Sequence, residues 1–250
     1  MKMYAAAALA LLAGVRTDPV CLRPSRAGIE VQGEVRICPG RYTIPDRAER
    51  GVIIAVTSNT HIDLTGVTLQ SGDTLASAFT GVGVASENAS NVTITGGAIH
   101  GYRYGIRLVG GRGHRVTNVD VSGSRAQRLV STPETFNVVD WLDVFHPDTF
   151  ERYGGAVYLK RTEDVSVTGI VAHDAQNGIG LFKVRHAYIA DNDVSRNSGW
   201  GIHLWRSSQN TIVRNKADHN VRCEGTTYRH GCDSAALLLR EQSDSNLVAD

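Results

Sequence analysis

Three short segments of the chain repeat one pattern: GAVYL at residues 155–159, GIGL at 178–181 and GIHL at 201–204. Each segment begins with a glycine, and the glycines at positions 155, 178 and 201 are equally spaced. The leucines that end the segments fall in one column when the segments are overlaid. Self-similarity at a fixed period of about 20 to 50 residues is typical of solenoids, arrays and propellers.

A second pattern has the same interval. Gly169, Asn192 and Asn215 each follow a β-branched run, and their spacing equals that of the three glycines. The intervening runs alternate apolar with polar residues and are separated by Gly, Asn, Asp and Ser, which is typical of strands and turns. Apolar residues at helical spacing do not persist for the length of a helix, which argues against helical repeats. Propeller blades need about 40 residues or more. We therefore predict a coil of short, stacked parallel strands.

With this repeat, residues 59–250 resemble the right-handed parallel β-helix proteins of the pectate-lyase superfamily. The resemblance implies an all-β, single-stranded, right-handed parallel β-helix with about 23 residues per coil. Length and composition agree, since 250 residues with 26 glycines suit one solenoid domain rich in tight turns. Residues 18–250 would form this domain, and residues 18–58 would supply its first strands and a cap. A net charge of +1 gives no basic field for nucleic acid.

The N-terminus and the cysteines point to export. Lys2 precedes an apolar run at residues 5–13, which predicts a signal peptide over residues 1–17 and is too short to span a membrane; a frayed or buried N-terminal segment is the alternative. The four cysteines form two local pairs without zinc-knuckle spacing, and we expect two disulfides in an oxidising compartment rather than four buried thiols. These pairs are Cys21 with Cys38 and Cys223 with Cys232. The predicted location is secreted or periplasmic.

Two insertions interrupt the repeat. The interval from Asn118 to Gly169 is more than twice the regular one, and the extra residues fall at 125–153. A second, cysteine-bracketed insertion falls at residues 221–233. Both occupy the same slot of the repeat, so they should project from one edge of the solenoid and wall a cleft. The chain ends at Asp250, just after a strand pattern, and we expect a further segment or another chain to cover an uncapped C-terminal end.

Alternation along the strands predicts what forms the floor of that cleft. If the repeated leucines point inward, the neighbouring residues point outward in two columns. Aromatic rings beside cations suit a carbohydrate, because rings stack on sugars and cations pair with carboxylates. The alternative is that the rings simply pack against the long insertion. The outward columns are Lys160, Phe182, Trp205 and Arg240, and Tyr158, Gly180, His203 and Leu238; Trp141 of the insertion is a further candidate for binding sugar.

The resemblance also implies a chemistry. A polyuronate lyase or epimerase needs a base and a partner that neutralises the sugar carboxylate, and burial near other cations can lower a lysine pKa far enough for it to act as a base. We predict Lys160 or Arg206 as the base, with Asp148 also in the catalytic set. Ca²⁺ would be held by Asp143, Glu151 and Asp233. The string His146-Pro147-Asp148 departs from the Asp-Pro-His motif of alginate epimerases, which weakens transfer of that site.

Two other functions remain open. A polysaccharide hydrolase would use paired carboxylates, but the paired aspartates and Gly-His-Gly of polygalacturonases are missing from the sequence. A non-catalytic β-helix used for binding or adhesion is the other alternative. The rhythm of residues 207–215 is similar to that of a periplasmic factor that helps mature the copper sites of nitrous oxide reductase. The predicted partner is an acidic polysaccharide or another glycan.

Overall fold

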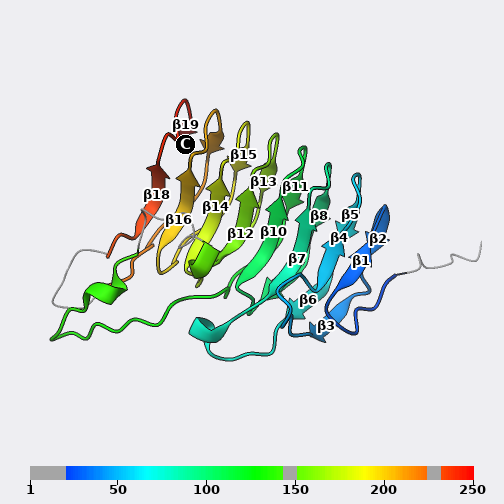
Figure 1. The fold of residues 1–250 in the computed structure, drawn as a ribbon, viewed down its shortest axis with the longest axis horizontal. Helices are drawn as coiled ribbons and strands as arrows, with labels where there is room; N and C mark the ends of the chain where they lie inside the picture. The colour runs from blue at the N-terminus through cyan, green and yellow to red at the C-terminus, as the bar shows by residue number, and fades with distance from the viewer. Residues whose placement is uncertain (1–20, 143–150, 224–231) are drawn as a thin grey trace, which may run out of the picture.

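The chain folds into a parallel β-helix, as predicted. The computed structural model describes residues 21–142, 151–223 and 232–250. Successive coils stack along one axis, so that strands far apart in the sequence lie side by side (Figure 1). The strands form two eight-stranded sheets and one three-stranded sheet, and neighbouring strands pair in parallel.

The first sheet carries the surface that matters for function. Its strands, in spatial order, are β1 (Ile29–Val31), β4 (Ile53–Ala55), β7 (Val82–Glu87), β10 (Tyr104–Val109), β12 (Gly155–Lys160), β14 (Asn177–Phe182), β16 (Trp200–Trp205) and β18 (Ala235–Arg240).

The other two sheets complete each coil. The second sheet contains β2 (Glu34–Arg36), β5 (His61–Asp63), β8 (Thr93–Thr95), β11 (Arg115–Thr117), β13 (Ser166–Thr168), β15 (Tyr188–Ala190), β17 (Thr211–Val213) and β19 (Leu247–Ala249), and the third contains β3 (Gly40–Thr43), β6 (Val67–Gln70) and β9 (Ala98–His100). Two short 3₁₀ turns are η1 (Ala76–Ala78) and η2 (Val138–Asp140).

The predicted inward column forms the core. Leu159 pairs with Leu181, and Leu181 pairs with Leu204, in the register expected from the repeat. All three are fully buried inside the coil with other aliphatic side chains. Burying each such side chain contributes about 1.5 to 3 kcal/mol. Leu239 continues the column on β18 but is 39% exposed.

The prediction assumed a constant number of residues per coil, but the structure shows that this number varies. Val157 pairs with Ile179, and Ile179 pairs with Ile202, so the first of these steps is one position shorter than the second. The difference arises because the linker from β13 to β14, residues 169–176, is one position shorter than the linker from β15 to β16, residues 191–199. As a result, Gly155 lies opposite Asn177 rather than opposite Gly178.

The asparagines of the second repeat pattern form a column that stabilises the turns from inside. Asn192 is 2% exposed; its Oδ1 accepts the main-chain N–H of Ile170 at 3.0 Å, and its Nδ2 donates to the carbonyl of Val167 at 3.0 Å. It also donates to Oδ1 of Asn215 in the next coil at 2.8 Å. Each asparagine thereby pairs main-chain groups that would otherwise be buried without partners.

Both predicted disulfides and the shared slot of the insertions are confirmed. Cys21 is bonded to Cys38, and Cys223 is bonded to Cys232. The first insertion separates β11 from β12 and the second separates β17 from β18, so both join a strand of the second sheet to the next strand of the first sheet.

Candidate functional site

The outer face of the first sheet carries the two predicted columns. Lys160 pairs with Phe182, Phe182 with Trp205 and Trp205 with Arg240. Tyr158, Gly180, His203 and Leu238 are likewise in register, one column away. The alternation of side chains along the strands therefore placed these residues correctly on the outer face.

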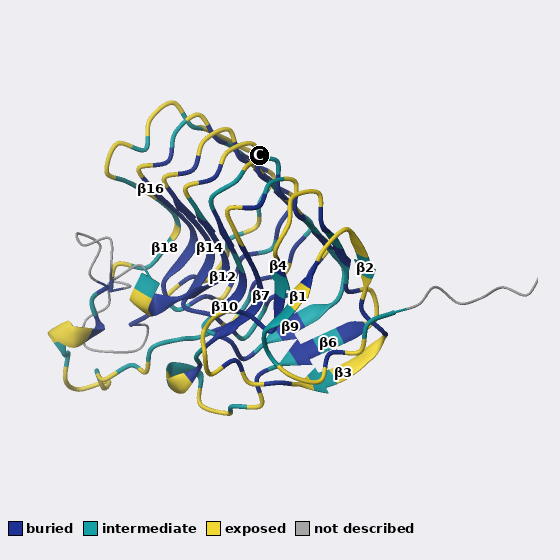
Figure 2. Ribbon diagram, turned by 45° about the vertical axis from the view of Figure 1, so that its right-hand side comes forward, coloured by how far each residue is buried: buried dark blue, intermediate teal, exposed yellow. Residues whose placement is uncertain are grey.

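These outward aromatic residues form a second apolar cluster. Phe182 and Trp205 stack with centroids 4.3 Å apart and planes 5° apart. Their exposures are only 5% and 6%, and that of Tyr158 is 1%. Figure 2 shows β14 and β16 as buried throughout although one of their faces is outward.

The first insertion contributes to this burial. Leu142 and Tyr153, near the two ends of the segment that the structure leaves undescribed, belong to the same cluster as Phe182 and Trp205. The expected open floor is thus a packed layer in this part of the face, which agrees with the alternative of insertion packing. The sugar-binding roles assigned to Tyr158, Phe182 and Trp205 stay predictions.

His203 lies in the same layer beside Trp200. The two ring centroids are 4.5 Å apart, and His203 is 2% exposed. Burial, with the nearby positive charge of Arg240, lowers the pKa of His203 to about 3. The imidazole is therefore neutral at physiological pH.

Lys160, the predicted base, is ion-paired. Its Nζ contacts Oε1 of Glu151, and the hydroxyl of Tyr158 donates to the same oxygen at 3.3 Å. The hydroxyl of Tyr104 donates to the main-chain carbonyl of Glu151. Because a neighbouring carboxylate favours the charged ammonium, Lys160 serves here as a cation that holds Glu151 against the sheet.

Three of the four residues that follow the outward column are cations, just past the ends of β12, β14 and β16; the fourth, after Arg240, is Glu241. The main-chain N–H groups of Arg161, Lys183 and Arg206 each donate to the carbonyl of the outward-column residue in the next coil, at 2.9, 2.9 and 3.2 Å. The three residues are therefore in register, about 4.8 Å apart per coil. All are exposed, and none has an ion pair among the described residues. We call Arg161, Lys183 and Arg206 the cationic ladder.

The ladder lies against the aromatic stack. Lys183 Nζ is 5.7 Å from the ring centroid of Phe182 and 5.8 Å from that of Trp205. The guanidinium carbon of Arg206 is 4.3 Å from the Trp205 centroid. These cation–π contacts hold the charged groups of Lys183 and Arg206 close to the rings.

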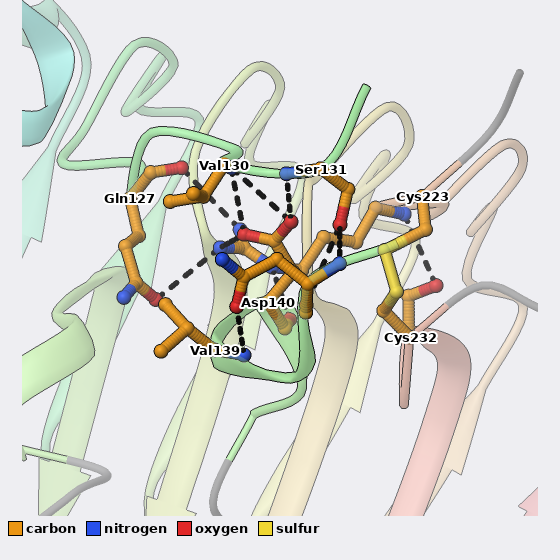
Figure 3. The surroundings of a disulfide bond; sticks show 10 residues. Gln127, Val130, Ser131, Val139, Asp140, Cys223 and Cys232 are labelled. Carbon is orange, nitrogen blue, oxygen red and sulfur yellow. Dashed lines mark hydrogen bonds and ion pairs between the residues drawn. A yellow bond between two sulfur atoms is a disulfide. The ribbon is translucent and has the colours of Figure 1, made fainter. Parts of the chain in front are cut away.

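A buried ion pair joins the two insertions. Arg222 Nε donates to the carbonyl of Asp140 at 2.7 Å, and the two charged groups are 3.7 Å apart with side-chain exposures of 1% and 0%. The Asp140 carboxylate also accepts the main-chain N–H groups of Val130 and Ser131 (Figure 3). Burial raises the pKa of Asp140, but these hydrogen bonds and Arg222 outweigh it and leave the pKa lowered.

The predicted calcium ligands are not brought together among the described residues. Asp143 and Asp148 lie outside those residues. Glu151 contacts Lys160, and burial raises the pKa of Asp233, which disfavours its charged form. No group of three His, Cys, Asp or Glu side chains capable of holding a metal occurs in the described ranges. The structure gives a calcium site no support.

The other predicted binding residues lie at the margins. Trp141 follows η2 and is partly buried. Arg240 ends β18, with 24% of its side chain exposed and its guanidinium 4.0 Å from Glu241. Arg206, predicted as a base, lies over Trp205 within the cationic ladder. The structure therefore places Arg206 and Lys160 at opposite ends of the aromatic stack.

Comparison with known proteins identifies the family. The sequence model of the family described as "Periplasmic copper-binding protein (NosD)" matches residues 42–231. The chain belongs to the NosD family. This agrees with the similarity of repeat style seen in residues 207–215, whereas membership of the pectate-lyase superfamily is not confirmed.

Other comparisons add little about function. No curated protein matches the chain. A solved structure of a candidate glycosyl hydrolase from Parabacteroides merdae is 12% identical, with a TM-score of 0.44 over 87% of this chain and 81% of that one. Over the described residues, none of the helices has the length and apolar character needed to cross a membrane.

The described residues do not fit a copper site. Copper in proteins prefers imidazole, thiolate and thioether ligands. All four cysteines are in disulfides, and the two methionines, at positions 1 and 3, are outside the described residues. The described histidines do not gather with other ligands into a group of three. His146 and His230 lie outside the described ranges.

The cationic ladder is the main feature that our interpretation of the sequence missed. Lys183 and Arg161 each follow the last alternating residue of a strand, so the alternation of outward side chains did not indicate them. Arg161 and Lys183 occupy the position one residue after Lys160 and Phe182, as Arg206 does after Trp205, so comparing these positions aligns the three cations. By contrast, the contact of Arg222 with Asp140 had no local signal in the sequence, since the two residues are 82 positions apart.

Proposed function

We propose that the chain is an extracytoplasmic β-helix protein that binds an acidic glycan along the cationic ladder. The carrying observation is that Arg161, Lys183 and Arg206 present three positive charges in register along the solenoid axis. Like charges in register in adjacent coils repel one another. A linear polyanion lying parallel to the axis would relieve this repulsion and pair with each cation.

The family and the disulfides support the location. The NosD family is described as periplasmic, and the bonds Cys21–Cys38 and Cys223–Cys232 suit an oxidising compartment. The covered rings of Phe182 and Trp205 stiffen the surface below the ladder but leave little ring face for a sugar. Charge pairing, rather than stacking, would thus provide most of the binding.

The geometry favours binding over cleavage or epimerisation. The residue predicted as base, Lys160, is engaged by Glu151, which stabilises its protonated form. Arg206, the other predicted base, lies over the ring of Trp205 at the far end of the aromatic stack. A non-catalytic binding protein is therefore the function that we propose, in line with the alternative left open by the sequence.

Affinity electrophoresis tests this function. We expect gels that contain polygalacturonate, alginate or chondroitin sulfate to retard the protein, and neutral dextran to leave its mobility unchanged. The double variant Lys183→Gln with Arg206→Gln should lose most of the retardation. Lys216→Gln is a matched control, because Lys216 pairs with Asp193 after β17, away from the ladder.

Two results would contradict the proposal. One is equal mobility in acidic and neutral gels. The other is release of unsaturated uronates, seen as new ultraviolet absorbance during incubation with a polyuronate and lost in Lys160→Ala, because this would establish a lyase instead of a binding protein.

A further inference from the structure

A second part of the outer face, nearer the N-terminus, contains an open hollow. One cavity of about 370 Å³ is lined by Glu49, Val82, Arg103, Tyr104, Arg107, Glu151 and Arg152. A neighbouring cavity of about 280 Å³ shares Glu49 and Arg107 with it. Glu49 and Arg107 are therefore the residues at which two cavities of small-molecule size meet.

The register of the first sheet explains the shape of this hollow. Ile54 pairs with Ala85, Ala85 with Arg107 and Arg107 with Tyr158, so all four share one outward column. The side chains of Ile54 and Ala85 are short and apolar, and they form the floor of the hollow. Tyr158, by contrast, lies under Glu151, where the end of the first insertion rests on the sheet. The hollow thus begins where the covering of the column ends.

The carboxylates around the hollow are largely neutralised. Glu49 accepts a hydrogen bond from Arg103 at 2.9 Å, and Glu151 pairs with Lys160. Arg107 is partly buried and has no ion pair or side-chain hydrogen bond with any residue that the structure describes. Nε of Arg103 is buried and has no acceptor in the same ranges. Donors are therefore in excess at the meeting point of the cavities.

We propose that this hollow binds a small hydroxylated monocarboxylate of the size of a sugar acid, with its carboxylate on Arg107. The guanidinium presents paired N–H donors that match a carboxylate. The rim carboxylates of Glu49 and Glu87 can accept hydrogen bonds from hydroxyl groups. The apolar floor of Ile54 and Ala85 suits the carbon face of a sugar ring.

The charge around the hollow selects a monoanion. Four arginines line the two cavities, at positions 50, 103, 107 and 152, against three glutamates at 49, 87 and 151, a difference of one positive charge. A more highly charged anion would exceed the single positive charge that the lining leaves in excess. This site is separate from the cationic ladder and does not depend on the function proposed for it.

Isothermal titration of the full chain with galacturonate tests the site, with galactose as its uncharged match and inorganic sulfate as a simple anion. We expect galacturonate to bind at millimolar concentration or better. Galactose should bind at least about tenfold more weakly, since it lacks the charge-assisted hydrogen bond to Arg107. Sulfate should also bind at least about tenfold more weakly, since it has neither hydroxyl groups for the rim carboxylates nor a carbon face for the apolar floor. Arg107→Gln should weaken galacturonate binding by a similar factor. Arg115→Gln, on β11 of the second sheet, should leave it unchanged.

Three outcomes would overturn the proposal. They are absence of galacturonate binding, equal binding to the wild type and to Arg107→Gln with unchanged melting temperatures, and binding of sulfate as tight as that of galacturonate. The first two would remove the site, and the third would reduce it to a general anion site. Loss of galacturonate binding in Arg107→Gln with polymer retardation retained would separate the two sites.

Discussion

Replacing Arg222 by methionine should open the first insertion. The substitution keeps an apolar stem of similar length but removes the donors to the Asp140 carbonyl at 2.7 Å and to the carbonyl and side chain of Gln127, each at 3.3 Å. The carboxylate of Asp140, with no exposed surface, then loses its cation. Removing one partner of a buried ion pair lowers stability by about 3 to 5 kcal/mol, because the other charge stays buried without compensation.

This loss should be local. The solenoid coils contact mainly their neighbours, so weakening one insertion need not unfold the rest. At about 1.4 kcal/mol per factor of ten, the main-chain amides of Val130 and Ser131 should exchange with solvent roughly a hundredfold to several thousandfold faster. Both amides donate to Asp140, so their exchange reports directly on the ion pair.

Hydrogen exchange with mass spectrometry on peptides that cover residues 127–142 measures this change. Arg214→Met is the matched control, because Arg214 pairs with Asp191 at the surface and lies away from the insertion. Adding Asp140→Asn to Arg222→Met should cost less than the sum of the single changes, since the two groups interact directly. Exchange in Arg222→Met that stays within about tenfold of the wild type would refute the buried clamp.

Three further predictions concern stability. The wild type should become less stable as pH falls from 6.5 towards about 3, because His203 takes up a proton in the unfolded chain while the folded imidazole stays neutral. His203→Leu should therefore have a melting temperature that depends less on pH in this range. A dependence as steep as that of the wild type would contradict the prediction. Asn192→Leu should lower the free energy of unfolding by about 1 to 3 kcal/mol for each main-chain group left unpaired, measured by denaturant titration, and no loss would argue against the asparagine column. Removing the Cys223–Cys232 bond with a double alanine variant should cost about 2 to 3 kcal/mol in thermal unfolding, and an unchanged melting temperature would contradict this contribution.

Much of the fold could be predicted because its signals are local. A nearly constant interval between coils sets which strands pair, and side-chain alternation then decides that Leu181 points inward and Phe182 outward. The disulfides and the shared slot of the insertions follow from the same counting along the chain. Only the exact step between coils was missed, since one linker is a residue shorter.

The state of the predicted site could not be derived in the same way. Whether Phe182 and Trp205 are open or covered depends on where the long insertion lies, and that depends on contacts such as Arg222 with Asp140 across 82 positions. Likewise, Lys160 looked like a candidate base until its contact with Glu151 was known. Alternation predicts which face a residue occupies, but a tertiary contact decides what chemistry it can do.

Salt dependence of glycan binding tests the cationic ladder most directly. Isothermal titration with oligogalacturonates at several salt concentrations should give a slope of log affinity against log salt that falls by roughly one third in Lys183→Gln, because one of three cations that displace counterions is missing. Lys216→Gln should keep the wild-type slope. Equal slopes in all three proteins, or binding that does not depend on salt, would contradict the proposed glycan surface.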